Sequence, residues 1–176
     1  MRTGLALAAI LVLAGCAGGG AERIVAGSGR DRIGPAEFAS FAASPAVELH
    51  GARPGGASDA EIAAALRLPP RFRDAPFRVT APGPQSRNET RIVINFGQTG
   101  GVDGQALCEG RIGPGQAATG FSAAAAFCRG ETSGRAALLT RSDALTPADP
   151  EFGRAMSRLI AEAAPRTEPI NRFRGD

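Results

Sequence analysis

The most constraining feature of the sequence is an amphipathic pattern near its C-terminal end, over residues 149–163. Apolar residues recur there every three or four positions, the spacing of one helix face: Phe152, Ala155, Met156, Leu159, Ile160 and Ala163. Asp149 and Pro150 supply an N-cap and a first helical residue. We expect this face to pack on a sheet that the rest of the chain supplies. A helix that binds a partner or lies on a membrane is the alternative.

Four segments supply that sheet as predicted strands, and the first two of them alternate apolar and polar residues. The segments "PFRVTAP" and "TRIVINFG" are separated by a turn-like loop, so we predict that they pair as a hairpin. The segments "FSAAAAFCR" and "RAALLTRS" are joined through "GETSG" and predict a second hairpin. The prolines around the first segment indicate an edge strand.

Shorter helices are predicted between and before these strands. Ser58 and Glu61 form a capping box that starts a helix over 59–68, which Pro69 and Pro70 end. The region 36–73 is expected to be helical in patches, with "PAEFASFAAS" as a short helix or a strand. The sequence therefore predicts one α+β domain over 36–168, with a small antiparallel sheet of about four strands and helices packed on one face. Residues 169–176 form a polar tail.

Two cysteines lie within this domain, Cys108 and Cys128. A short helix over 102–109 carries the first, and the second has the strand parity opposite to Phe127. A disulfide would fasten the helix to that side of the sheet and contribute roughly 3 kcal/mol. Free reactive thiols and a metal site are the alternatives. The single histidine, His50, is distant in sequence, so no metal or cofactor is predicted.

The first residues predict an export signal rather than part of the fold. Met1-Arg2-Thr3 is short and positively charged, and "GLALAAILV" is a continuous apolar run. That run is shorter than the roughly 20 residues of a membrane-spanning helix. We therefore expect residues 1–15 to be a removable signal peptide.

The signal ends in Leu13-Ala14-Gly15-Cys16, which resembles the lipobox of bacterial lipoproteins. The resemblance implies that the Cys16 thiol is acylated and becomes the new N-terminus, anchored at the periplasmic face of the envelope. Because Ala17 rather than aspartate follows, the resemblance favours the outer membrane over the inner membrane. The glycine-rich residues 16–35 then form a flexible tether of roughly 25 Å.

Charge excludes one class of partner. All 20 basic residues other than histidine are arginine, the net charge is +3, and acidic and basic residues alternate along the chain. The sequence has no basic stretch of the kind that binds nucleic acid. The arginine, alanine and glycine content is typical of a GC-rich genome.

Catalytic motifs do not emerge from the sequence. Neither a Gly-x-Ser-x-Gly nor a His-Glu-x-x-His pattern occurs, and a general base at His50 needs an acid or a serine beside it. We expect a non-enzymatic accessory or docking module that is membrane-bound through its lipid and binds an envelope protein. The alternatives are a lipid or small-ligand binding module, and an envelope hydrolase with an unrecognised site.

Overall fold

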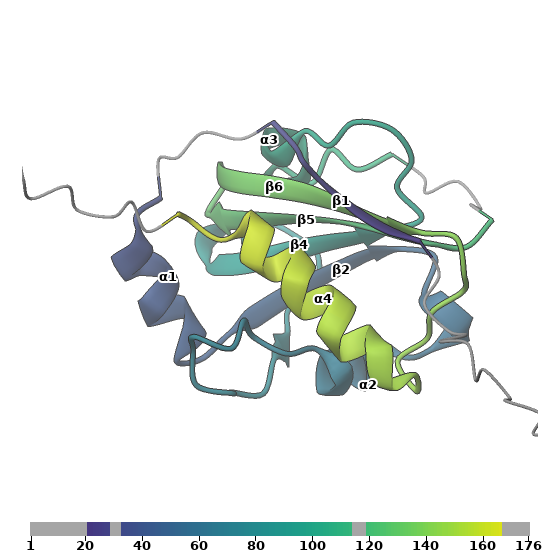
Figure 1. Ribbon diagram of the computed structural model, residues 1–176. Coiled ribbons are helices and arrows are strands. Elements are labelled where there is room, and N and C mark those ends of the chain that lie inside the picture. Colours follow the sequence, from purple (N-terminus) through teal and green to yellow (C-terminus); the bar gives the residue numbers. More distant parts are fainter. Residues whose placement is uncertain (1–20, 29–32, 114–118, 167–176) are drawn as a thin grey trace, which may run out of the picture.

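The structure is a computed structural model that describes residues 21–28, 33–113 and 119–166. These residues form a mixed six-stranded sheet in the order β1-β6-β5-β4-β2-β3, with helices on both faces (Figure 1). The elements in chain order are β1 Glu22–Ala26, α1 Pro35–Ala42, β2 Ala46–Gly51, η1 Pro54–Gly56, α2 Asp59–Ala65, β3 Arg78–Val79, η2 Ser86–Asn88, β4 Thr90–Phe96, α3 Gly104–Cys108, β5 Phe121–Arg129, β6 Thr132–Arg141 and α4 Pro150–Ala163.

The sheet combines a parallel half with an antiparallel half. Strand β2 lies between β3 and β4 and runs parallel to both. Strands β4, β5, β6 and β1 follow one another in antiparallel pairs. The predicted hairpin between "PFRVTAP" and "TRIVINFG" is therefore wrong, because β2 separates the two strands. The predicted hairpin of β5 and β6 is confirmed.

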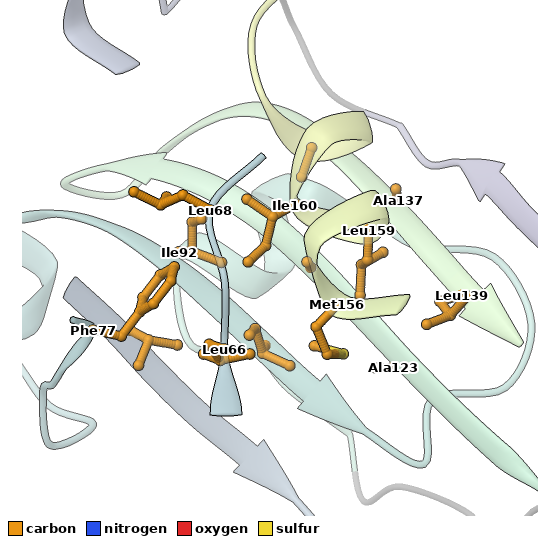
Figure 2. Packing of buried hydrophobic residues seen from close by; sticks show 14 of the residues in the cluster. Leu66, Leu68, Phe77, Ile92, Ala123, Ala137, Leu139, Met156, Leu159 and Ile160 are labelled. Carbon is orange, nitrogen blue, oxygen red and sulfur yellow. The ribbon is translucent and has the colours of Figure 1, made fainter. Parts of the chain in front are cut away.

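Helix α4 packs its apolar face on the antiparallel half of the sheet, as its periodicity predicted. Figure 2 shows Met156, Leu159 and Ile160 directed from the helix into the core cluster that holds Ala123 and Ala137 of the strands. All of these side chains are fully buried. The short alanine side chains let the helix approach the sheet closely, which increases dispersion contacts.

Helices α1 and α2 extend the same core toward the parallel half. Phe38 and Phe41 of α1 pack edge-on against Phe127 of β5, with ring centroids 4.9 and 5.2 Å apart. The capping box of α2 is confirmed, because Ser58 Oγ accepts a bond from the backbone N–H of Glu61 and the Glu61 carboxylate accepts one from the backbone N–H of Ser58. The helix ends at Ala65, earlier than predicted.

Helix α3 lies on the opposite face of the sheet, where a second cluster of buried residues includes Val93, Leu107 and Ala126. Cys108 of this helix and Cys128 of β5 form a disulfide with their Cα atoms 5.5 Å apart. The predicted bridge and its side of the sheet are confirmed. The prediction that the helices pack on one face is wrong, since α3 covers the other.

Two further predictions need correction. The sheet has six strands rather than about four, and its strands are not all antiparallel. Strand β2 lies in the region expected to be helical, and strand β1 lies inside the predicted tether over 16–35. Strand β1 pairs in register with β6, Glu22 opposite Arg141, so residues 22–26 belong to the sheet. Residues 16–20, the predicted signal peptide and the tail over 169–176 lie outside the described residues.

Candidate functional site

A row of polar side chains lies on the face of the sheet that carries α3. Successive strand residues point to opposite faces, so Glu48 and His50 of β2 share this face with Arg91 and Asn95 of β4. Glu48 is 2% exposed, and Arg91 and Asn95 are fully buried. Buried charges are rare unless they are paired, so this row is the most distinctive chemistry of the domain.

Arg91 forms hydrogen bonds to three separate segments of the chain. Its Nε donates to Glu48 Oε2 at 2.6 Å, its Nη1 to the carbonyl of Gly130 at 2.8 Å, and its Nη2 to the carbonyl of Cys108 at 3.0 Å. The guanidinium thereby joins β2, the β5–β6 turn and the disulfide-bearing end of α3. Because each guanidinium nitrogen donates to an acceptor and one acceptor is a carboxylate, the buried charge is paired, which offsets the cost of burying it.

Glu48 also binds His50, whose Nε2 lies 2.6 Å from Glu48 Oε1. Burial alone raises the pKa of Glu48, but hydrogen bonds from His50 and Ser86 and the charge and bond of Arg91 outweigh it and lower the pKa to about 2. Glu48 is therefore ionised at neutral pH. It can orient an imidazole or balance a guanidinium, but it cannot deliver a proton as a general acid.

The sequence did not show which side chains surround His50. The structure places His50 beside the acidic residue Glu48. A carboxylate next to an imidazole is the orienting half of a hydrolytic triad. Ser86, which forms a hydrogen bond to Glu48, is fully buried. Its Oγ contacts both the carbonyl oxygen of Gly83, at 2.8 Å, and the carboxylate of Glu48, so the hydroxyl belongs to the same buried polar cluster. The Glu48–His50–Arg91 arrangement is thus that of a structural connection.

Sequence reasoning missed this cluster. Arg91 was assigned to the polar face of a hairpin strand, and Glu48 to a region expected to be helical. The available signal was one charged residue in each of two mainly apolar stretches. These are the acidic Glu48 in "AVELH" and the basic Arg91 in "RIVIN". Two such stretches that lie side by side and are covered on both faces have to pair those charges.

A surface cavity of about 270 Å³ opens at the ends of the same strands. It lies at the carboxyl ends of the parallel strands β2 and β4, a common position for ligands in sheets with parallel strands. Its apolar part includes Phe96, Phe121 and Leu145, and Ser122 also lines it. Within the described chain, Ser122 Oγ and the nearby Asn95 Oδ1 are buried without a hydrogen-bond partner.

A second surface feature, the α4 groove, lies between α4 and residues 66–70. The groove has a volume of about 400 Å³ and combines apolar residues with three arginines: Arg67, Leu68, Pro70, Gly153, Arg154, Ser157, Arg158 and Ala161. The arginine side chains are about half exposed. Arg158 also binds the carboxylate of Glu22 in β1 through Nε and Nη2, both at 2.7 Å.

Among the residues that the structure describes, no three metal-binding side chains gather into one group, and no helix is both long and apolar enough to cross a membrane. The predicted lipidation residue, Cys16, lies outside the described residues. Comparison with protein-family models, with curated proteins and with solved structures finds no match to the chain.

Proposed function

We propose that the chain is a bacterial envelope lipoprotein that acts as a non-enzymatic accessory or docking module. It is held through acylated Cys16 at the periplasmic face of the envelope, with the outer membrane favoured by Ala17. The observation that carries this proposal is the buried disulfide between Cys108 and Cys128. Disulfides persist in oxidising compartments such as the periplasm, which is where the lipobox resemblance would deliver the chain.

The polar cluster on the α3 face supports a structural rather than a catalytic role for its members. The bonds of Arg91 link three separate segments, and the carboxylate of Glu48 holds both His50 and Arg91. Side chains that are committed to one another in this way rigidify a domain. A rigid domain with exposed grooves suits a protein that works by docking.

In-cell cross-linking of the tagged protein, followed by mass spectrometry of the captured species, tests the docking role. Intact-mass measurement of the same sample reads the acylation of Cys16 independently. The proposal expects an acylated protein captured with one dominant membrane complex. An unacylated mature chain would contradict the anchor, and an acylated protein that captures no protein would contradict the docking role.

A second candidate function, small-ligand binding, is favoured by the cavity at the ends of β2 and β4. Its apolar walls are joined by Ser122, whose buried Oγ has no hydrogen-bond partner among the described residues. Such a combination is typical of small-molecule sites. Thermal-shift screening of small amphipathic molecules against the purified protein tests this candidate, and a stabilising ligand would support it.

A further inference from the structure

We propose that the α4 groove docks on anionic phospholipid headgroups of the membrane in which the chain is anchored. This rests on the proposed function, because it takes Cys16 as the point of attachment. It adds which face of the domain meets the membrane and which lipid chemistry that face recognises.

The first argument is the length of chain between the anchor and the fold. Only five residues, 17–21, lie between Cys16 and Glu22, where β1 begins. A fully extended chain spans at most about 3.6 Å per residue, so the anchor lies within about 20 Å of Glu22. The connection is much shorter than the 20-residue tether predicted over 16–35, because β1 begins within that range. The domain is therefore held close to the bilayer surface.

The second argument is what lies beside Glu22. Its carboxylate accepts bonds from Arg158 of α4 at 2.7 Å and from Arg141 of β6 at 3.0 Å. Residue Arg158 also lines the α4 groove. The segment that follows the anchor therefore joins the domain beside Arg158 of α4. A short connection to the membrane at this point also places the α4 groove near the membrane.

The third argument is the chemistry of the groove. The side chains of Arg67, Arg154 and Arg158 are 53%, 62% and 48% exposed, and they come from two separate segments of the chain. Guanidinium groups bind phosphate oxygens with two parallel hydrogen bonds. The apolar residues that line the groove at its surface, Pro70 and Ala161, suit the glycerol and upper acyl region below a headgroup phosphate.

The acidic neighbours of these arginines leave them available for phosphate. Arg154 pairs with Glu151, Arg158 with Glu22, and Arg67 lies 3.9 Å from Asp74. The pairs of Arg67 and Arg154 are solvent-exposed and contribute little because water screens them, whereas Arg158 keeps its bonds to Glu22, which is 18% exposed, and offers its remaining N–H groups. A headgroup phosphate can share such a guanidinium with its carboxylate partner, and an anionic surface attracts each arginine further.

Arginine footprinting on the acylated full-length protein tests the proposal directly. The protein is reconstituted into vesicles of phosphatidylcholine alone or of phosphatidylcholine with phosphatidylglycerol, and an arginine-specific dicarbonyl reagent is added. We expect Arg67, Arg154 and Arg158 to be protected in the anionic vesicles only. Arg111 is the internal control, since it is 63% exposed and pairs with Glu109 after α3.

Matched variants separate docking from general electrostatics. Arg154→Gln should lower the ratio of docked to undocked protein about fivefold, which is the effect of one basic residue near an anionic surface. Arg111→Gln removes an equally exposed, equally paired charge and should leave the protection of Arg158 unchanged. Because both positions are exposed, both variants are expected to fold, and circular dichroism verifies this.

The two proposals fail separately in this experiment. An intact mass without acyl chains overturns the anchor before any vesicle is made. An acylated, reconstituted protein with equal modification of Arg67, Arg154 and Arg158 in both vesicle types overturns the docking of the groove and leaves the anchor standing. Protection that Arg111→Gln removes as strongly as Arg154→Gln also overturns it.

Discussion

Glu48 is a carboxylate that the fold surrounds with donors, and its burial makes those donors indispensable. Arg91 and His50 each lie 2.6 Å from one of its oxygens. On the protein surface, water could replace a lost hydrogen-bond partner of Glu48. Because Glu48 is only 2% exposed, water does not reach its carboxylate. Removal of either Glu48 or Arg91 would therefore leave the other as an uncompensated buried charge and destabilise the fold.

Replacement of Glu48 by glutamine is expected to destabilise the domain strongly. Glu48→Gln leaves Arg91 as a buried cation without a carboxylate, which costs about 3–5 kcal/mol. Urea denaturation followed by circular dichroism measures the loss. Glu131→Gln removes a carboxylate that is 59% exposed and should change the free energy of unfolding by less than about 0.5 kcal/mol. Equal effects of the two substitutions would contradict the role assigned to the buried pair.

The same residue predicts a pH dependence with a definite sign. The pKa of Glu48 is lowered from its ordinary 4.5 to about 2, so the folded state favours the ionised form. Its contribution to stability is complete above pH 4.5 and is lost as the pH falls from there through 2. The free energy of unfolding of Glu48→Gln should therefore decline less over that interval than that of the unaltered protein.

Ser122 offers a test of the cavity at the ends of β2 and β4. If its buried Oγ has no partner in solution, Ser122→Ala removes an unsatisfied hydroxyl and should stabilise the domain by about 1–3 kcal/mol. Thermal unfolding of the two proteins measures the change. A loss of stability would show that water or a ligand satisfies the hydroxyl, which would strengthen the small-ligand candidate.

At the scale of elements, the disulfide joins α3 to the sheet and closes a loop of 20 residues. Cys108→Ser and Cys128→Ser should each lower the free energy of unfolding by roughly 3 kcal/mol, since either change opens the same loop. The double substitution should cost no more than either single one. Additive losses in denaturant titrations would mean that each cysteine also has an independent role.

Strand β1 depends on the carboxylate of Glu22, which binds arginines of both β6 and α4. Glu22→Gln should weaken the edge strand by about 1–2 kcal/mol, which corresponds to roughly five- to thirtyfold more frequent opening. Limited trypsin digestion, with mass spectrometry of cleavage after Arg23, measures that opening. Glu89→Gln is the control, because it removes an exposed ion pair with Arg78 far from β1. Unchanged cleavage would show that backbone pairing alone holds the strand.

The elements that the sequence predicted are those with a local signal. Helix α4, the β5–β6 hairpin and the side of the sheet that carries the disulfide follow from periodicity and turn residues. Strand β2 has no visible alternation because both of its faces are covered, and Glu48 is buried rather than exposed. Its insertion between β3 and β4 depends on contacts distant in sequence, which a pattern of neighbouring residues does not encode.

On the scale of the whole molecule, the anchor remains the prediction with the widest consequences. Cys16→Ser removes the thiol that the lipobox resemblance requires, so labelled palmitate should not be incorporated and the precursor should keep its first 15 residues. Metabolic labelling and electrophoretic mobility measure both. Ala17→Ser is the matched control and should be processed normally. Acylation that persists in Cys16→Ser would exclude the lipobox.

The place of β1 in the sheet also determines how the molecule responds to mechanical load. Tension applied through the proposed anchor at Cys16 would act first on the pairing between β1 and β6. The strand lies at the sheet edge and outside the loop that the disulfide closes, so it can peel away while the other strands keep their pairing. Release of residues 22–28 would lengthen the chain between Cys16 and the folded domain by about 20 Å. The edge strand would therefore detach under load before the rest of the sheet unfolds.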